Sequence, residues 1–527
     1  MKLNLNGIRD RAVWDKANIA LPKFDIKKVT ENTKKEPSWI HFGAGNIFRA
    51  FPAAVLQKAL DEGIYDKGVI VAEGFDYEII DRAYRPFDNL SLLAVLKSDG
   101  TADKKVIASV TESLKADKSF TEDWNRLLEI FRAPSLQMVS FTITEKGYSV
   151  SESDTAKGFD PSLIMGKITL LLLARFNAGQ LPVTLQSMDN CSHNGDKVKA
   201  AVLAYADAWT AAGLVPADFA GYLRNETKVT FPWSMIDKIT PRPDAKIKAL
   251  LDSDGFEDSE VIVTAKNTYT SSFVNAEETE YLVIEDNYTC GRPPLEAGGV
   301  LFTDRETVDK VEKMKVCTCL NPLHTAMSIF GCMLGYTLIS DEMKDEDILG
   351  LITKIGYIEA MPVVVDPGVL KPADFIGAVL EKRLPNPFMP DAPQRIATDT
   401  SQKLSIRFGE TIKAYLECGL NTDELVLIPL VLAGYARYLT GIDDEGNTFT
   451  PSPDPLLEEL QAIVAPLKIT ESKQDMSCLE KLYSRSDIFG VDLYKAGLGE
   501  RIIKMTEELF AGTGAVRKTL HKYVSGR

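Results

Sequence analysis

The stretch PSWIHFGAGNIFRAFPAAVLQKALDEG (residues 37–63) decides the fold of the first half of the chain. Residues 39–42 form a short apolar run that predicts a strand, and residues 43–46 predict a tight turn. Residues 51–60 have the apolar spacing of an amphipathic helix, and a second apolar run follows at residues 67–75. A strand, a helix and a second strand in this order predict a βαβ unit.

The rest of the chain divides into two parts of different character. Strand-like runs at residues 136–144 and 181–190 continue the alternation of strands and helices, which predicts a doubly wound parallel sheet of the Rossmann type. Beyond residue 290 the patterns are long and helical. We therefore expect an α/β domain over residues 1–290 and a mostly α-helical domain over residues 291–527, joined by the Gly- and Pro-rich segment 286–299. A length of 527 residues agrees with two domains, because single cores stop growing near about 250–300 residues.

Composition excludes several classes of protein. The formal charge is −15, from 75 acidic and 60 basic side chains, so nucleic-acid binding is not expected. No apolar run approaches the roughly 18 residues that cross a bilayer, and the first residues are polar, so we expect a cytoplasmic protein without a membrane partner. Seven scattered cysteines and four histidines form no disulfide framework and no zinc-ligand cluster, so no metal is expected.

The first turn has features of a dinucleotide site. Gly43 and Gly45 follow the first strand, where missing side chains let backbone N–H groups approach a pyrophosphate at the start of the next helix. Phe48 stands where the usual fingerprint has its third glycine, and a plain strand-to-helix turn is the alternative interpretation. Glu73 and Asp76, at the end of the second strand, are candidates to bind the adenosine ribose and favour NAD over NADP, or are ordinary loop carboxylates.

Five segments in order resemble one enzyme family. They are HFGAGNIFRA (41–50), TITEKGY (142–148), SMDNCSHNG (187–195), FPWSMIDKITP (231–241) and YLVIEDNYTCGRPP (281–294). In these segments the chain resembles the mannitol dehydrogenase family of polyol-specific long-chain dehydrogenases. The resemblance implies NAD as cofactor, a dinucleotide-binding N-terminal domain and a substrate-binding, catalytic C-terminal domain. The cofactor-binding residues that we expect are Gly43, Gly45, Asn46, Phe48, Arg49, Glu73, Asp76, Thr144 and Glu145.

The segment EKMKVCTCLNPLHT (312–325) holds the catalytic candidates. The resemblance assigns Lys315 as the acid–base group, Asn321 and His324 as the groups that hold the reacting oxygen, and Glu312 as a proton-exchange residue. Hydride transfer needs a partner that moves the hydroxyl proton, and an amide and an imidazole stabilise developing oxygen charge. No zinc Lewis acid is then required. Without the resemblance, these residues would be solvated helix lysines, a helix cap and a core histidine.

The spacing in this segment departs from the family pattern. Five residues separate Lys315 from Asn321, one more than mannitol 2-dehydrogenase has, and Lys313 remains an alternative acid–base group. Pro322 predicts that one helix ends here and another begins, with Asn321 as its N-cap and the extra residue absorbed at the break.

A second cluster lies in residues 386–408. It resembles the substrate-binding helix of the family, in which an Arg and a Lys eight residues apart, here Arg395 and Lys403, reach the substrate. Two cations can bind hydroxyls or a carboxylate through charge-assisted hydrogen bonds. Alternatively, Arg395, Asp399, Lys403 and Arg407 recur every four residues and form a salt-bridged exposed helix face.

The resemblance implies a function. Asn190 and Asp237 would bind further substrate hydroxyls, with the substrate between the two domains. CTCLNPLHT (317–325) is similar to the hexuronate branch of the family, which implies NAD-dependent, lysine-dependent interconversion of D-fructuronate and D-mannonate without a metal. Mannitol 2-dehydrogenase and tagaturonate reductase activities are the alternatives, and a non-catalytic NAD-binding protein or an epimerase with bound NAD remain open. We expect a monomer or a small homo-oligomer.

Overall fold

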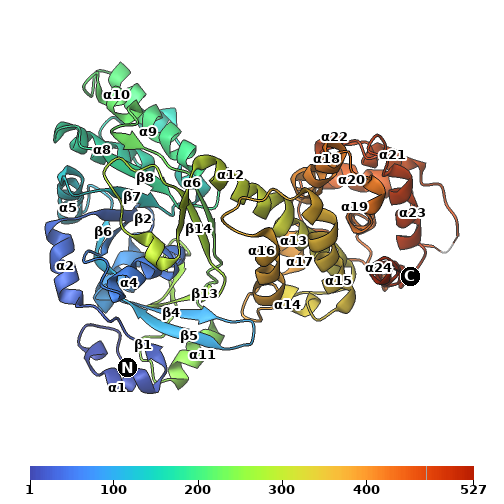
Figure 1. The fold of residues 1–527 in the computed structure, drawn as a ribbon, viewed down its shortest axis with the longest axis horizontal. Helices are drawn as coiled ribbons and strands as arrows, with labels where there is room; N and C mark the ends of the chain where they lie inside the picture. Colours follow the sequence, from blue (N-terminus) through green and yellow to red (C-terminus); the bar gives the residue numbers. More distant parts are fainter. Residues whose placement is uncertain (471, 527) are drawn as a thin grey trace. The chain divides into compact units, whose positions relative to one another are not determined.

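The N-terminal half is built on a six-stranded parallel sheet. The computed structural model describes residues 1–470 and 472–526, and the strand order is β6-β3-β2-β7-β8-β9 (Figure 1). Counted along the chain within this sheet, the order is 3-2-1-4-5-6, which is that of a Rossmann fold and confirms the predicted fold class. The strands are β2 (Trp39–Phe42), β3 (Val69–Glu73), β6 (Val110–Lys115), β7 (Met138–Phe141), β8 (Val183–Ser187) and β9 (Val229–Thr230).

Helices cover both faces of this sheet, because successive residues of each strand point to opposite sides. Ile40 and Ile70 join a core with α5, α8, α9 and α10, whereas Trp39 and Val69 join a second core with α2, α3 and α4. The helices of the N-terminal half are α1 (Arg11–Lys16), α2 (Ile26–Lys35), α3 (Asn46–Ala50), α4 (Pro52–Asp61), α5 (Thr121–Arg132), α6 (Thr144–Gly147), α7 (Glu152–Thr155), α8 (Ile164–Asn177), α9 (Asn194–Ala211), α10 (Phe219–Arg224) and α11 (Ala245–Ser253).

Smaller sheets extend the second face, and the sequence patterns did not predict them. One has the order β1-β5-β4-β13, another β10-β14-β15, and β11 and β12 form an antiparallel pair. Their strands are β1 (Ile19–Ala20), β4 (Ser91–Leu96), β5 (Ala102–Ile107), β10 (Ser234–Asp237), β11 (Ile262–Val263), β12 (Tyr269–Thr270), β13 (Phe273–Glu277), β14 (Tyr281–Glu285) and β15 (Leu301–Thr303).

The chain forms two compact units. Unit 1 contains residues 1–97 and 101–309, and unit 2 contains residues 98–100 and 310–527. The division lies later than residue 290, because the segment 286–299 packs on unit 1: a Cβ at Gly298 would lie 2.6 Å from the carbonyl oxygen of Val55. The functional roles that we assign to the two domains stay a prediction.

Unit 2 is helical and is centred on α13 and α19. All residues of α19 are buried, and α13 packs against α15, α17 and α19. The helices are α12 (Arg305–Met314), which crosses the unit boundary, and α13 (Asn321–Met333), α14 (Ile339–Glu342), α15 (Glu346–Lys354), α16 (Pro372–Ala378), α17 (Pro393–Ile396), α18 (Glu410–Glu417), α19 (Leu427–Tyr438), α20 (Leu457–Val464), α21 (Glu480–Tyr483), α22 (Ser486–Phe489), α23 (Gly499–Leu509) and α24 (Ala515–Ser525).

The helix expected in the second cluster (residues 386–408) is interrupted, and that prediction was wrong. Asp399 has a left-handed backbone (φ 54°) and its N–H donates to the carbonyl oxygen of Pro453, so α17 ends and the chain resumes in the π-helical turn η10 (Ser405–Gly409). A continuous salt-bridged face through Arg395 and Lys403 therefore does not form.

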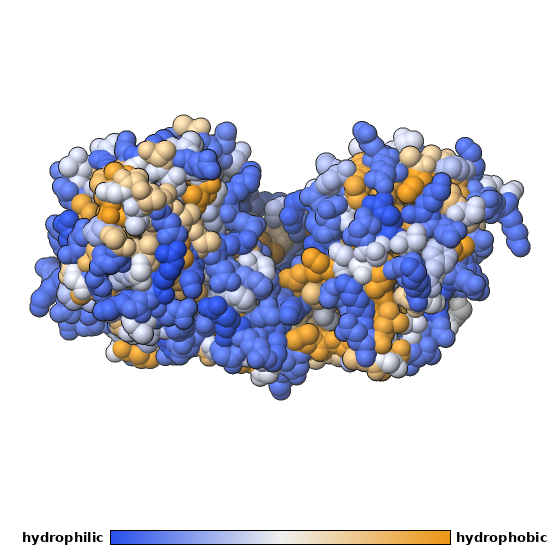
Figure 2. Space-filling view, turned by 90° about the horizontal axis from the view of Figure 1, so that it is seen from above, coloured by the Kyte–Doolittle hydropathy of each residue, from blue (hydrophilic) through white to orange (hydrophobic). Residues whose placement is uncertain are grey.

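The visible surface is mostly hydrophilic, with hydrophobic areas interspersed on both units (Figure 2). Such a surface is ordinary for a folded chain, because apolar atoms always contribute to it. Within the part of the chain that the structure describes, we find no helix with the length and apolar character needed to cross a membrane.

Candidate functional site

The predicted glycine turn lies between β2 and α3, at the carboxyl end of the sheet. Gly43 has φ +105°, its N–H donates to the carbonyl oxygen of Ala72, and a Cβ there would lie 2.2 Å from the carbonyl oxygen of Thr142. Only glycine fits this close approach. Gly45 precedes the first residue of α3 and borders open space, because a Cβ at this position would have no neighbouring atom within 4 Å.

Glu73 ties this turn to the end of β3. Its buried carboxylate accepts hydrogen bonds from the N–H groups of Ala44 (2.8 Å), Phe75 (2.8 Å) and Asp76 (3.2 Å). Burial raises the pKa of Glu73, whereas these three donors favour the ionised form. Asp76 is also buried and accepts from the Thr264 hydroxyl at 2.6 Å, which holds the β11–β12 hairpin. Both candidate ribose carboxylates thus have structural contacts within unit 1.

Two of the expected cofactor residues lie in the core beneath the turn. Phe48 is fully buried and stacks on His41 with ring centroids 4.2 Å apart. Arg49 is also fully buried, donates to the Ser271 carbonyl oxygen (2.6 Å) and to Asn46 Oδ1 (2.8 Å), and has its pKa lowered by burial. These contacts hold α3 in place, so a role of Phe48 and Arg49 in cofactor binding would be indirect.

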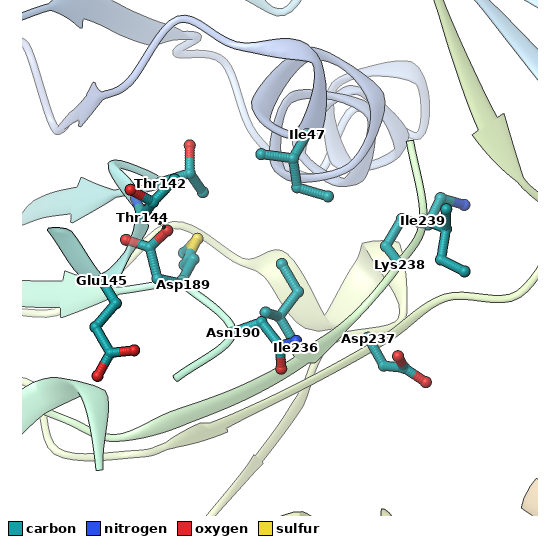
Figure 3. A pocket seen from close by; sticks show the side chains of 11 residues that line it. Ile47, Thr142, Thr144, Glu145, Asp189, Asn190, Ile236, Asp237, Lys238 and Ile239 are labelled. Carbon is teal, nitrogen blue, oxygen red and sulfur yellow. Dashed lines mark hydrogen bonds between the residues drawn. The ribbon is translucent and has the colours of Figure 1, made fainter. Parts of the chain in front are cut away.

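A pocket of about 310 Å³ brings four of the predicted residues together in unit 1 (Figure 3). It lies where β7 and β8 end, between α3 and β10, beside the switch point of the sheet where dinucleotides bind in Rossmann folds. Ile47 of α3 lies on one side, and Asn190 and Ile236 lie opposite it. Its lining residues are Ile47, Thr142, Thr144, Glu145, Met188, Asp189, Asn190, Ile236, Asp237, Lys238 and Ile239.

Asp189 organises this pocket, and sequence reasoning missed it. Its carboxylate accepts from the N–H groups of Ile143 (3.0 Å) and Thr144 (2.8 Å) and from the Tyr148 hydroxyl (2.5 Å). Thr144 has a left-handed backbone (φ 64°), and these bonds hold it there. One signal in the sequence could have identified it. Asp189 follows β8 and the Thr-rich residues 142–144 follow β7, and the carboxyl ends of neighbouring parallel strands lie at the same edge of the sheet.

Asp189→Ala should lower the free energy of unfolding by about 2 kcal/mol, because two partly buried N–H groups and a buried phenol lose their acceptor. The KM for the nicotinamide cofactor should rise in parallel. Urea unfolding and steady-state kinetics measure the two effects, with Tyr148→Phe as the matched variant that removes one of the three bonds. Equal stability of Asp189→Ala and the wild type would contradict this role.

Lys315 occupies the first position of a π-helical turn in unit 2. This turn, η5 (Lys315–Cys319), continues α12 and closes with the Leu320 N–H donating to the Lys315 carbonyl oxygen at 3.1 Å. A π-helical turn accommodates one extra residue within a helix, which accounts for the longer spacing between Lys315 and Asn321. Lys315 is 5% exposed, whereas Lys313 is exposed, so burial favours Lys315 over its alternative. Glu312 is half-buried on α12.

Asn321 and His324 lie in the first turn of α13. The helix begins at Asn321 itself and Leu320 takes the cap position without a side-chain bond, so the prediction of Asn321 as N-cap was wrong. The π-helical turn carries the chain directly into α13, which leaves no extended residue for a cap at Asn321. Both side chains are half-buried, and η5 packs against α13.

Arg395 and Lys403 have different surroundings in unit 2. Arg395 is exposed and donates to both carboxylate oxygens of Asp391 at 2.7 and 2.6 Å. Lys403 is half-buried, and its Nζ donates to the carbonyl oxygens of Ile396 and Thr398. Their proposed contact with substrate stays a prediction.

Among residues 1–470 and 472–526, no group of three or more His, Cys, Asp and Glu side chains is arranged to hold a metal ion. A metal-independent reaction remains an expectation that activity measurements must decide.

Two family models match most of the chain. The mannitol dehydrogenase Rossmann domain matches residues 37–297, and the mannitol dehydrogenase C-terminal domain matches residues 307–510. The D-mannonate oxidoreductase of Thermotoga maritima is 51% identical to this chain and covers 99% of each sequence. The polyol:NADP oxidoreductase of Gluconobacter oxydans is 28% identical over 85% of this chain and 88% of its own length.

Solved structures share the fold over nearly the whole length. A D-sorbitol dehydrogenase in substrate-free form has a TM-score of 0.79 at 25% identity and covers 96% of this chain and 98% of its own. The Pseudomonas fluorescens mannitol 2-dehydrogenase in ternary complex with NAD and D-mannitol has a TM-score of 0.68 at 24% identity and covers all of both chains. At this identity the second likeness shows the fold alone.

Proposed function

This chain belongs to the mannitol dehydrogenase family, and from that premise we propose that it interconverts D-fructuronate and D-mannonate with NAD(H). As a family member it is an NAD-dependent polyol or aldonate dehydrogenase. The observation that supports the substrate is the 51% identity, over 99% of both chains, to a protein named D-mannonate oxidoreductase. The same identity argues against the two alternative activities, mannitol 2-dehydrogenase and tagaturonate reductase.

We assign cofactor binding to unit 1. Gly43 allows the turn its close approach to β7, and the first N–H groups of α3 have no partners within the helix, which suits a pyrophosphate. The pocket lined by Thr144, Glu145 and Asn190 lies at the switch point and suits the nicotinamide end. Two features of unit 1 support its assignment as the NAD-binding part: the open space at Gly45 and this pocket.

The chemistry requires a proton carrier and an oxygen site in unit 2. NADH supplies the hydride when it is bound. In the proposed reduction, Lys315 donates the proton to the ketone oxygen as it becomes a hydroxyl, and in oxidation it accepts that proton. The Asn321 amide and the His324 imidazole donate hydrogen bonds to the same oxygen and stabilise its developing charge. Glu312, one helical turn before Lys315, exchanges the proton with solvent.

Reduction assays at 340 nm with D-fructuronate, D-tagaturonate and D-fructose test this function, each with NADH and with NADPH. We expect the highest kcat/KM with D-fructuronate and NADH. A preference for D-fructose would point to mannitol 2-dehydrogenase activity, and a preference for D-tagaturonate to tagaturonate reductase activity. Cofactor binding without turnover on any ketose would favour the non-catalytic alternative.

A further inference from the structure

Arg407 is a half-buried cation of unit 2 that has no anionic partner among the residues that the structure describes. It lies in η10, and its guanidinium is largely shielded from water, which lowers the pKa of Arg407 to about 10. Nη1 donates to the Thr325 hydroxyl, and this neutral group is its sole hydrogen-bond partner among the residues that the structure describes. A shielded cation with no anion is costly, so the arrangement suits an anion from outside the chain.

Two other arginines of unit 2, the fully buried Arg437 and the half-buried Arg517, have their donors satisfied by the chain. Arg437 donates to the carbonyl oxygens of Leu509, Ile442 and Asp443, and Arg517 donates to two carboxylates. The remaining nitrogens of Arg407 are not enclosed in the protein, since they are absent from the buried polar atoms that lack a partner. Its unused donors can therefore reach a ligand.

Lys403, one turn before Arg407, adds a second cation that has no ion pair. Its Nζ donates to two backbone carbonyl oxygens, those of Ile396 and Thr398, and to no carboxylate among the described residues. Burial and the nearby Arg407 lower the pKa of Lys403, although Asp399 and Asp454 act in the opposite direction. Lys403 and Arg407 therefore place positive charge here that no ion pair neutralises among the described residues.

Arg395, the other cation of this cluster, is already neutralised by its bidentate pair with Asp391. A carboxylate would therefore meet Lys403 and Arg407 before Arg395. An arginine fork matches two carboxylate oxygens in a way that a hydroxyl group does not.

The position of Arg407 relates it to the proposed oxygen site. The Thr325 hydroxyl that accepts from Arg407 also donates to the carbonyl oxygen of Asn321 at 3.2 Å, and His324 is the adjacent residue. The backbone of η10 is held firmly, because a Cβ at Gly409 would lie 2.2 Å from the carbonyl oxygen of Phe489. Arg407 thus lies beside the residues that we propose to hold the reacting oxygen.

We propose that Arg407, assisted by Lys403, binds the substrate carboxylate and makes this enzyme prefer sugar acids to uncharged polyols. The inference rests on the proposed function. In a linear six-carbon ketose acid the carboxylate is several bonds from the reacting ketone, so an anion site next to Asn321 and His324, but separate from them, has the required arrangement.

Arg407→Gln tests the proposal in the full-length enzyme. We expect its KM for D-fructuronate to rise about 100-fold, the effect of losing charge-assisted hydrogen bonds, while its KM values for D-fructose and NADH stay within twofold of the wild type. Arg407→Lys keeps the positive charge but loses the two-pronged guanidinium, so its KM for D-fructuronate should lie between those of the wild type and Arg407→Gln. Lys413→Gln, which removes an exposed cation of α18, is the matched control and should behave as wild type.

Equilibrium binding of D-mannonate and D-mannitol to the enzyme–NADH complex gives a second readout that needs no turnover. The proposal predicts that Arg407→Gln loses D-mannonate binding and leaves D-mannitol binding unchanged. Equal losses for both ligands, no loss for either, or a raised KM for NADH alone would overturn it. If the wild type binds D-mannonate but does not reduce D-fructuronate, the proposed function is wrong. The binding of D-mannonate to Arg407→Gln then still decides whether Arg407 binds a carboxylate.

Discussion

Lys315→Ala should lower kcat for D-fructuronate reduction by about 10³-fold, the usual contribution of a positioned general acid–base group. The lysine is buried at the start of η5, and no other lysine follows it before Asn321. The affinity for NADH, measured by fluorescence titration, should remain as in the wild type, because the glycine turn is in unit 1.

Lys313→Ala is the matched control for this experiment. Lys313 lies two residues earlier and is exposed, so its loss removes the same charge from the same helix without touching the buried position. We expect near wild-type kcat from Lys313→Ala. If Lys313→Ala were inactive and Lys315→Ala active, Lys313 and not Lys315 would be the acid–base group.

Glu342→Gln should stabilise the protein, by an amount that grows with pH. Glu342 is fully buried on α14, lies against Gly331 of α13, and neither carboxyl oxygen has a hydrogen-bond partner among the described residues. Burial, with the nearby Asp345 and Asp391, raises the pKa of Glu342 from 4.5 to about 9. The folded protein therefore keeps a proton on this carboxyl that the unfolded chain loses.

The sign of the pH effect follows from proton binding. Between the unfolded pKa of 4.5 and the folded pKa of about 9, the unfolded state binds fewer protons, so stability falls as pH rises. Glutamine carries no such proton. The gain in unfolding free energy should increase from about 2 kcal/mol at pH 6 to about 5 kcal/mol at pH 8.

Urea unfolding at these two pH values measures the Glu342→Gln effect. Glu507→Gln, an exposed position on α23, is the control and should show no such trend. A Glu342→Gln variant whose stability relative to wild type is the same at pH 6 and pH 8 would show that Glu342 is ionised in the folded protein.

The sequence predicted four of the six strands of the central sheet, β2, β3, β7 and β8, because each lies in a short run rich in apolar residues. It did not predict β6, whose sequence VTESLK is half polar, or β9, which has only two residues. Residues 39–42 were predicted as a strand, and β2 has those bounds. The strands β4, β5, β13 and β14 were not predicted. Strands β13 and β14 pair with segments far apart in the chain, β4 and β10, whereas β4 and β5 form a local antiparallel pair that the sequence analysis did not recognise. The break at Asp399 was also missed, since its left-handed backbone is stabilised by a bond to the distant Pro453.

The candidate site was partly predictable. Motif order identified Thr144, Glu145, Asn190 and Asp237, which the structure brings to one pocket. Asp189 was missed because its role depends on backbone N–H groups of a neighbouring strand end. Arg407 was considered only as part of a salt-bridged helix face, and its lack of an anionic partner appears only after folding places it against Thr325.

Oxidation of D-mannonate by NAD⁺, followed as NADH formation beside D-altronate and D-mannitol, tests the proposed function most directly. We expect D-mannonate to give the highest kcat/KM of the three, with D-fructuronate as the product. Equal or faster oxidation of D-altronate or D-mannitol, or no NADH formation with any of them, would contradict it.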